Sequence, residues 1–194
     1  MLLTEPLPNT PEWKSRRSGR LTASYFGAAL GLSPFMSRQA LWRELTGRAE
    51  PFAGNEMTAY GNNNEARAIG DYEEQTGNLV LPARFVPLDD WSGCTPDGYV
   101  GDDGLIECKC PYTQKIYEEW PAHYRAQVLG QLFITQRQWC DCWCWTPQEG
   151  KVVERINFHA EEWIAMHLAL KVFWGYVLDD EAPPRQAKFK MKGK

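Results

Sequence analysis

Hydrophobic positions in the first eighty residues recur at helical spacing. Ser37 suits the start of a helix and Gly47 its end, and between them Leu45 follows Leu41 and Trp42 by four and three positions. A longer helix is predicted over about residues 56–76, where Gly77 provides the stop. The first part of the chain is therefore expected to be mainly helical.

From residue 79 the pattern changes to short hydrophobic runs separated by turn residues. One run extends from Gly93 to Val100, the turn Gly101-Asp102-Asp103-Gly104 follows, and a second run covers Leu105 to Cys110. This pattern predicts neighbouring strands that fold back on one another.

The second half alternates between helix and strand patterns. Pro121 can lie in the first turn of a helix that reaches Phe133, and strict alternation predicts a strand at Trp139–Trp145. A strand at Val152–Phe158 follows a turn, and a last helix is predicted over about residues 160–178. That helix is apolar around most of its circumference, so we expect it to pack on two sides.

The order of elements predicts one α/β domain with a mixed central β-sheet flanked by helices. We find no internal repeat and no interior linker, so residues 1–182 are assigned to this single domain. Pro183-Pro184 ends the last helix and opens a basic C-terminal tail over 183–194.

Composition places the chain among ordinary globular proteins, with 43% hydrophobic and 24% charged residues in 194. No apolar run approaches the ~20 residues of a membrane helix, and Met1 to Pro11 lacks a secretory pattern, so we expect a soluble, cytoplasmic protein with no membrane association. The net charge of −4 argues against coating nucleic acid through bulk positive charge. Basic residues are instead concentrated near Arg16-Arg17 and in the tail, which allows a local basic site.

The six cysteines do not form a zinc pattern. Cys140, Cys142 and Cys144 alternate along a predicted strand, and Cys108 and Cys110 do the same. We expect small, reduced core residues. Three histidines, His123, His159 and His167, have no spacing that makes a metal site and are expected to be structural.

The segment with the most chemistry is Thr95-Pro96-Asp97-Gly98 together with Ile106-Glu107-Cys108-Lys109. On a strand Glu107 and Lys109 face the same way, while Ile106, Cys108 and Cys110 face the core. The intervening turn brings Asp97 back beside Glu107, so two carboxylates and an ammonium group are expected at one point.

Carboxylate oxygens are the ligands that Mg²⁺ or Mn²⁺ prefers. A divalent cation beside a lysine suits phosphodiester hydrolysis, because the ion neutralises charge on the phosphate and lowers the pKa of bound water, which Lys109 can position or deprotonate. The spacing alone is weak evidence for a metal site, because charged residues often alternate on a half-exposed strand. Pro96 and Gly98, which bracket the aspartate in a turn, strengthen the interpretation.

This arrangement resembles the PD-(D/E)xK nuclease superfamily, whose motif corresponds to Pro96-Asp97 and Glu107-Cys108-Lys109, so a restriction-endonuclease-like core is implied. With the flanking motifs included, the chain resembles the phage lambda exonuclease and YqaJ viral recombinase family from about Trp13 to Trp145. The matching positions, in the same order, are Trp13, Arg16-Arg17, Gly19, Leu21-Thr22-Ala23-Ser24, Gly61, Glu65, Glu107-Cys108-Lys109-Cys110-Pro111 and Tyr124-x-Ala126-Gln127-Val128.

The resemblance implies catalytic roles for individual residues. Asp97 and Glu107 would bind Mg²⁺, for which Mn²⁺ can substitute, and the backbone carbonyl of Cys108 would add a ligand. Lys109 would act on the nucleophilic water, and Gln127 would support that lysine and water.

Further positions would assist a second metal or recognise the DNA end. Glu65 would assist a second metal, and Arg17 with Ser24 would hold the 5′-terminal phosphate. Thr22 and Ser24 also suit a helix start, where free amides accept an anion. The family implies a deoxyribonuclease that processively degrades one strand of linear double-stranded DNA in the 5′→3′ direction as a homotrimeric ring. Its single strands would pass to an annealing protein for recombination.

Other interpretations stay open at this stage. Arg17, Glu65 and Gln127 are each compatible with an ordinary surface role. The metal motif alone fits an endonuclease of the restriction or junction-resolving type equally well. A non-catalytic protein that binds DNA ends or a recombination partner is the alternative from a different class.

Overall fold

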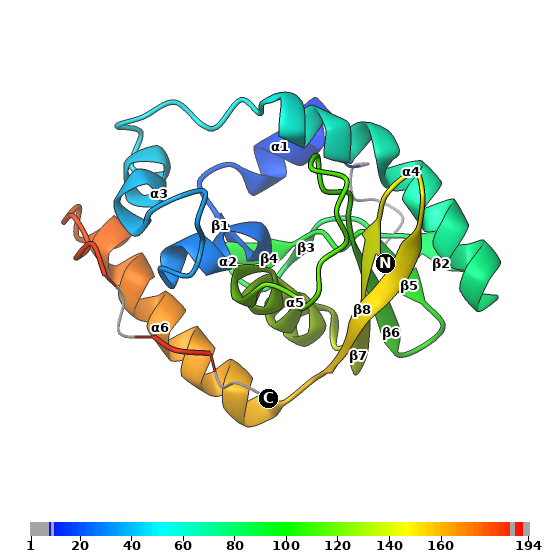
Figure 1. Ribbon diagram of the computed structural model, residues 1–194. Helices are drawn as coiled ribbons and strands as arrows, with labels where there is room; N and C mark the ends of the chain where they lie inside the picture. The colour runs from blue at the N-terminus through cyan, green and yellow to red at the C-terminus, as the bar shows by residue number, and fades with distance from the viewer. Residues whose placement is uncertain (1–7, 9, 187–188, 192–194) are drawn as a thin grey trace.

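The alternating segment Trp139–Trp145 lies inside a five-stranded sheet in the computed structural model, which describes residues 8, 10–186 and 189–191 (Figure 1). The strands, in sheet order, are β2 (Val80–Pro82), β5 (Gly98–Val100), β6 (Gly104–Lys109), β7 (Trp139–Trp145) and β8 (Gly150–Asn157). Only β6 and β7 run parallel, and the other pairs are antiparallel. The predicted mixed sheet is therefore confirmed, with strand ends shifted by one or two residues.

A second sheet of three short strands was not predicted. It consists of β1 (Leu21–Thr22), β4 (Ser92–Cys94) and β3 (Val86–Pro87), in the order β1-β4-β3. The prediction of one continuous run from Gly93 to Val100 is wrong, because β4 and β5 belong to different sheets. Pro96, between them, has no N–H to offer a ladder, so the chain leaves one sheet and enters the other at this point.

Six helices are present in the described chain: α1 (Pro11–Arg17), α2 (Ala23–Ala29), α3 (Arg38–Leu45), α4 (Glu56–Thr76), α5 (Ala122–Thr135) and α6 (Ala160–Leu178). The predicted caps are confirmed: the Ser37 hydroxyl accepts the Ala40 N–H at 3.1 Å, and Gly77 ends α4 with a φ of 71°. Pro121 is the N-cap of α5 rather than part of its first turn.

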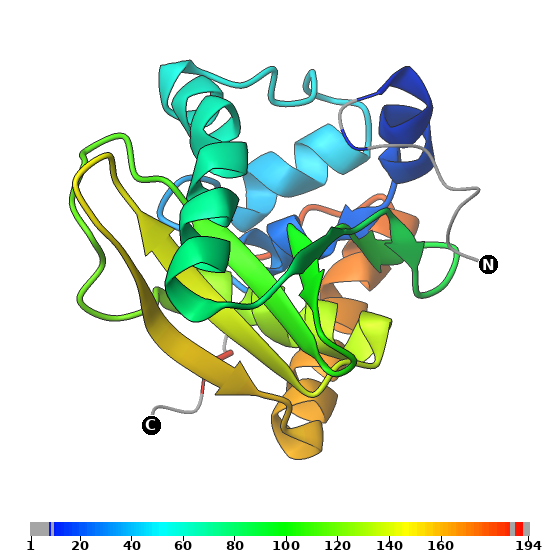
Figure 2. The same cartoon turned by 90° about the vertical axis from the view of Figure 1, so that its right-hand side faces the viewer.

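Each face of the five-stranded sheet has its own hydrophobic core. Ala68 and Tyr72 of α4 pack with Ile106, Cys108 and Trp143 on one face. The other face, with Leu105 and the three cysteines of β7, packs against α5, α2 and α6. Figure 2 shows α4 lying across the sheet and α6 on the far side. Because β6 is sandwiched between helices, even the carboxylate of Glu107 is fully buried, whereas Lys109 at the end of the strand is partly exposed.

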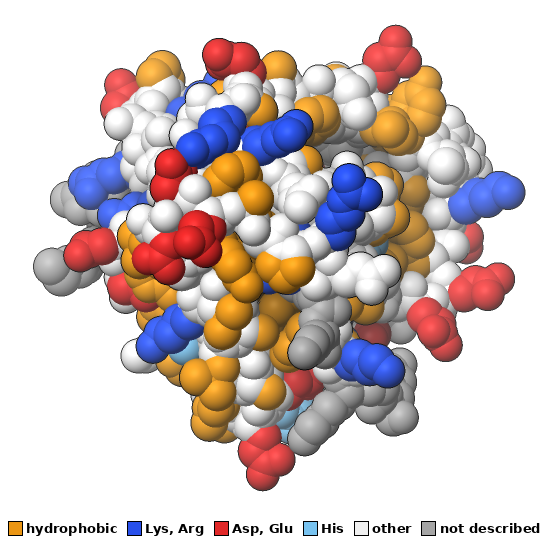
Figure 3. Space-filling view, turned by 90° about the vertical axis from the view of Figure 1, so that its left-hand side faces the viewer, with side chains coloured by type: hydrophobic (Ala, Val, Ile, Leu, Met, Phe, Trp, Pro, Cys, Tyr) orange, Lys and Arg blue, Asp and Glu red, His pale blue; other side chains and the backbone are white. Residues whose placement is uncertain are grey.

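Helix α6 buries only one side, so the prediction that it packs on two sides is wrong for the described chain. Trp163, Met166 and Phe173 are buried, whereas Ile164 and Leu168 are 58% and 59% exposed. Figure 3 looks onto the face that carries α6 and shows hydrophobic side chains running across it. An apolar helix face thus remains uncovered within the part of the chain that the structure describes.

The described part of the C-terminal tail lies against the body of the protein. The Gln39 amide donates to the Pro183 carbonyl at 3.1 Å, and Phe189 and Met191 pack against the larger core. Two parts of the chain that carry predictions lie partly outside the described residues. They are the tail, at residues 187–188 and 192–194, and the start, at residues 1–7 and 9, where the sequence showed no secretory pattern. The boundary at 182/183 stays a prediction.

The prediction that the cysteines are reduced core residues is confirmed for all but Cys110, which is only half-buried. All six cysteines have free thiols, and every one except the half-buried Cys110 is buried. Among the described residues no helix is long and apolar enough to cross a membrane.

Candidate active site

The hairpin of β5 and β6 brings Asp97 beside Glu107. Gly98 pairs with Ile106 across the hairpin, so Asp97, one residue before β5, lies opposite Glu107. The Cys108 N–H donates to Asp97 Oδ2 at 2.7 Å and holds the carboxylate at this position. The predicted turn, which folds the chain back so that Asp97 lies beside Glu107, is therefore observed.

Glu107 is fully buried and accepts three hydrogen bonds. Its Oε1 accepts from Lys109 Nζ and, at 2.6 Å, from Gln127 Nε2. Its Oε2 accepts from Gln131 Nε2 at 2.7 Å. Gln131 belongs to no motif recognised in the sequence, although its i+4 spacing from Gln127 on a helix puts both amides on one face. Burial of an unneutralised carboxylate is costly, and these donors offset that cost.

Lys109 is held as a cation within the site. Its Nζ lies 4.7 Å from the centroid of the Tyr124 ring as well as against Glu107. Burial alone would lower the pKa of Lys109, but the charges of Glu107 and Asp97 outweigh burial and raise it. The amine is therefore protonated in this arrangement and acts as a positive charge between carboxylates.

Two further carboxylates feel the charge of Glu107. Burial raises the pKa of Asp97 well above its usual value, and the nearby Glu107 raises it further. Burial and Glu107 also raise the pKa of Glu65, which projects from α4. Three acids thus surround one lysine, and the local excess of negative charge is what a divalent cation would neutralise.

The acids do not form a finished metal cage. Among the residues that the structure describes, no three His, Cys, Asp or Glu side chains converge tightly enough to hold an ion. The donor set of hard carboxylate oxygens with raised pKa values nevertheless fits Mg²⁺ or Mn²⁺ chemically. No contact in the structure distinguishes the Cys108 carbonyl as a ligand.

Arg17, Thr22 and Ser24 form a second polar cluster. Arg17 Nη2 donates to the hydroxyls of Thr22 and Ser24, each at 3.3 Å, and the two hydroxyl oxygens lie 3.0 Å apart. Thr22 is the N-cap of α2, yet its side chain makes no capping bond. The Trp13 ring centroid lies 4.0 Å from Arg17 Cζ. A guanidinium and two hydroxyls of this kind suit a phosphate group.

The two clusters are linked through the segment before Asp97. Trp13 Nε1 donates to the Thr95 hydroxyl at 3.1 Å, two residues from Asp97. Burial raises the pKa of the Cys94 thiol, Glu107 raises it further and Arg17 lowers it, so Cys94 lies within range of both charges. The cluster of Arg17, Thr22 and Ser24 is therefore adjacent to the carboxylates.

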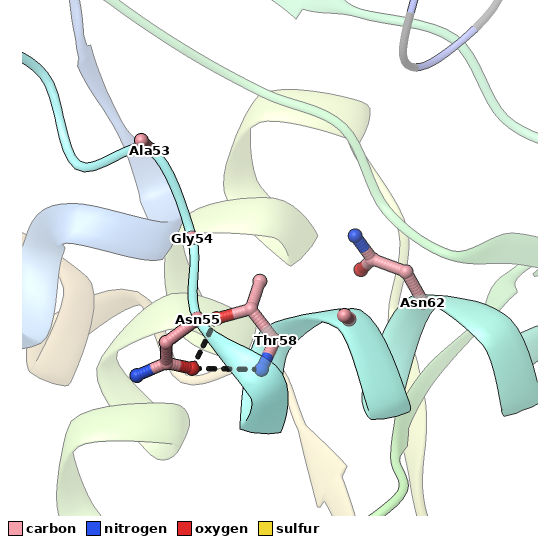
Figure 4. Close-up of a pocket in the computed structure, with 6 residues that line it drawn as sticks. Ala53, Gly54, Asn55, Thr58 and Asn62 are labelled. Atoms are coloured by element: carbon pink, nitrogen blue, oxygen red, sulfur yellow. Dashed lines mark hydrogen bonds between the residues drawn. The ribbon is translucent and has the colours of Figure 1, made fainter.

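A hollow of about 300 Å³ opens at the start of α4, lined by Asn55, Thr58 and Asn62 among others (Figure 4). Thr58, Asn62 and Glu65 are spaced by four and three residues and so share one face of α4. This face leads from the hollow to the acidic cluster.

His123 contacts the ring of Phe35, and His167 contacts the ring of Trp163. Burial lowers the pKa of His123 to about 4, which keeps its imidazole neutral.

Comparison with known proteins gives a family and a fold. The family model of the YqaJ-like viral recombinase domain matches residues 12–138. The alkaline exonuclease LHK-Exo from Laribacter hongkongensis has a TM-score of 0.76 at 26% identity, covering 88% of this chain and 94% of its own. Its complex with dAMP has a TM-score of 0.77 with the same identity and coverage. No curated protein sequence matches significantly.

A phage-related exonuclease from Haemophilus somnus 129PT has the same fold, with a TM-score of 0.66 at 15% identity over 81% of this chain and 93% of its own. The predicted PD-(D/E)xK-type α/β fold is thereby confirmed. Because the family model covers well over half of the sequence, the chain belongs to the YqaJ-like viral recombinase domain family.

Proposed function

We propose that the protein is a metal-dependent deoxyribonuclease that removes nucleotides from the 5′ end of one strand of linear double-stranded DNA. The observation that carries the proposal is the proximity of Asp97, Glu107 and Lys109, in which Lys109 bonds Glu107 and the Cys108 N–H between them holds Asp97. The neighbouring Arg17 cluster supports it, since it offers an anion site beside that group. Membership of the recombinase family and the similarity to two exonucleases point to the same chemistry.

Asp97 and Glu107 would hold Mg²⁺, which Mn²⁺ can replace, with the Cys108 carbonyl as a further ligand and Glu65 assisting a second ion. The cation, when bound, supplies neutralisation of phosphate charge and a lowered pKa for its water. The chain's own contribution is to aim these oxygens at one place and keep Lys109 beside them. Lys109 and Gln127 then orient the attacking water through their N–H groups.

Arg17 would bind the 5′-terminal phosphate together with Thr22 and Ser24. A 5′-terminal phosphate has a free, ionisable oxygen that is esterified in an internal phosphodiester, so it offers this pocket one more charged hydrogen-bond acceptor. Cleavage one nucleotide from that anchor would make the enzyme an exonuclease and fix its 5′→3′ direction. The dAMP bound by LHK-Exo is consistent with a mononucleotide product.

A homotrimeric ring would explain processive degradation, because a closed ring cannot leave the DNA between cuts. The uncovered apolar face of α6 supports a contact between subunits. The single strands produced would serve an annealing protein in recombination.

The decisive substrate comparison is linear duplex against covalently closed circular DNA, each with Mg²⁺ and with EDTA. We expect nucleotide release from the linear duplex only in Mg²⁺, and intact circles throughout. Cutting of circles would favour an endonuclease, and DNA binding without hydrolysis would favour a non-catalytic end-binding protein.

The end-recognition pocket predicts a change in preference for Arg17→Ala. Wild-type protein should degrade 5′-phosphorylated ends faster than 5′-hydroxyl ends, and the variant should lose most of that preference, because a charge-assisted bond to phosphate is worth about 1.5–3 kcal/mol, or roughly 10- to 100-fold. Lys14→Ala, on the exposed side of the same helix, should keep the wild-type ratio. An unchanged ratio in Arg17→Ala would locate end recognition elsewhere.

A further inference from the structure

Gln131 is a buried amide of α5 that contacts the acid at the centre of the site. Its side chain is 1% exposed, and its Nε2 donates to Glu107 Oε2 at 2.7 Å. Its other polar atom, Oε1, is buried and has no hydrogen-bond partner among the described residues. A buried polar side chain with half of its bonding capacity unused is uncommon in a purely structural position.

The orientation of this amide follows from its neighbour. An ionised carboxylate can only accept hydrogen bonds, so the nitrogen of Gln131 must face Glu107 and the oxygen must point elsewhere. The unused oxygen is therefore a consequence of the bond to Glu107.

The two oxygens of Glu107 differ in how fully they are occupied. Oε1 accepts from both Lys109 and Gln127, whereas Oε2 accepts from Gln131 alone. Since each carboxylate oxygen has about two lone-pair directions, Oε1 is saturated and Oε2 keeps one direction open. The oxygen held by Gln131 is thus the one with capacity for a further ligand.

We propose that Gln131 is a positioning residue, which fixes the Glu107 carboxylate so that the open side of Oε2 is directed at a divalent cation. The inference rests on the proposed metal-dependent function and adds a residue to it. A partner that holds a metal-binding carboxylate typically changes metal affinity by about 10- to 100-fold when it is removed.

A residue with only a structural role would behave differently. Its removal would lower the stability of the fold without changing how tightly the folded protein binds metal. Leu129 provides this comparison, because it is fully buried on the same helix and belongs to the larger hydrophobic core.

The test is Mn²⁺ binding to the full chain without DNA, measured from the electron paramagnetic resonance signal of free Mn²⁺. Wild type, Gln131→Met and Leu129→Ala are titrated at the same pH, and each is melted in EDTA to establish that it is folded. Met keeps the length of the side chain and removes its polar atoms. If Gln131→Met does not fold, Gln131→Asn takes its place, since its amide is one methylene too short to reach Glu107.

We expect the dissociation constant for Mn²⁺ to rise about 10-fold or more in the Gln131 variant. Leu129→Ala should melt at a lower temperature and bind Mn²⁺ as tightly as wild type. Mn²⁺ affinity within twofold of wild type in the Gln131 variant would overturn the inference and leave the proposed function standing. Wild-type protein that neither binds Mn²⁺ nor cuts DNA would overturn the proposed function itself.

Discussion

At the scale of single residues, the site places more negative charge in one buried region than the chain alone can neutralise. Glu107 is fully buried with three hydrogen-bond donors, and burial together with the charge of Glu107 raises the pKa of both Asp97 and Glu65. Lys109 provides the positive charge nearest to Glu107. Such an arrangement lowers the stability of the metal-free protein, and the proposed bound cation would relieve it.

This excess charge predicts that Asp97→Asn stabilises the metal-free protein. A raised carboxyl pKa means that the folded state binds a proton more tightly than the unfolded state, so its stabilising contribution is present at acid pH and is lost as pH rises through the folded pKa. At alkaline pH the Asp97 carboxyl therefore makes the fold less stable than a neutral side chain of the same shape would. Asn removes that charge and can still accept the Cys108 N–H.

We expect urea unfolding in EDTA at pH 8 to give Asp97→Asn a higher free energy of unfolding than wild type, because Asn removes the penalty of burying this carboxyl group beside Glu107. The advantage should shrink as the pH is lowered. Asp102→Asn, in the exposed turn after β5, is the control and should match wild type. A loss of stability in Asp97→Asn would contradict this account of the charges.

At the scale of elements, helix α4 joins the acidic cluster to the sheet. The Tyr72 hydroxyl donates to Asp141 Oδ2 of β7 at 2.7 Å, and Trp145 Nε1 donates to the Asp71 carboxylate. Glu65 lies seven residues before Tyr72, on the same face of the helix. The position of Glu65 is therefore set by bonds formed two turns away.

Elements with a local signal could be predicted from the sequence, and those that depend on distant partners could not. The alternation of Trp139–Trp145 and the capped run of α4 specify their own conformation. The two-residue strands β1 and β3 exist only through pairing with β4, and the run ending at Val100 was wrongly joined across Pro96.

The candidate site divides in the same way. Motif positions such as Asp97 and Lys109 could be identified in the sequence, and the structure brings them together. The full burial of Glu107 and its bond to Gln131 depend on α5, in which Gln131 lies 24 residues further along the chain. No local pattern encodes that contact.

The attachment of α4 predicts different effects for two tyrosines of one helix. Tyr72→Phe should lower the free energy of unfolding by about 1.5–3 kcal/mol, because it removes a buried hydrogen bond to a charged group. Tyr60→Phe is the matched control, since the Tyr60 hydroxyl is buried and has no hydrogen-bond partner among the described residues. It should be neutral or slightly stabilising in urea unfolding. Equal losses in both variants would show that the Asp141 bond does not hold the helix.

At the scale of the whole molecule, the active-site clusters and the uncovered apolar helix face belong to different parts of the structure. Ile164, Leu168 and Val172 recur at intervals of four on α6, and each is more than half exposed. Exposed apolar side chains arranged as a stripe are typical of a surface that another protein covers. A subunit contact here would be independent of the acids and of the cluster of Arg17, Thr22 and Ser24.

The proposed ring predicts that Ile164→Ser combined with Leu168→Ser yields monomers that keep their fold. Sedimentation velocity should give wild type a mass of about three chains and the double variant the mass of one, because the variant loses apolar contact area. Leu79→Ser, which changes an exposed leucine that precedes β2, should leave the mass unchanged. A wild-type protein that is strictly monomeric at working concentration would exclude the ring.

The central claim is that Asp97, Glu107 and Lys109 together catalyse phosphodiester hydrolysis. Its most direct test is the rate of mononucleotide release from 5′-phosphorylated linear duplex in Mg²⁺ by wild type, Asp97→Asn, Lys109→Ala and the exposed-site control Lys151→Ala. The account predicts wild-type release by the control and a fall of about 100-fold or more in the other two variants, since each loses a metal ligand or the group that orients the water. Undiminished release by Asp97→Asn or Lys109→Ala would contradict it.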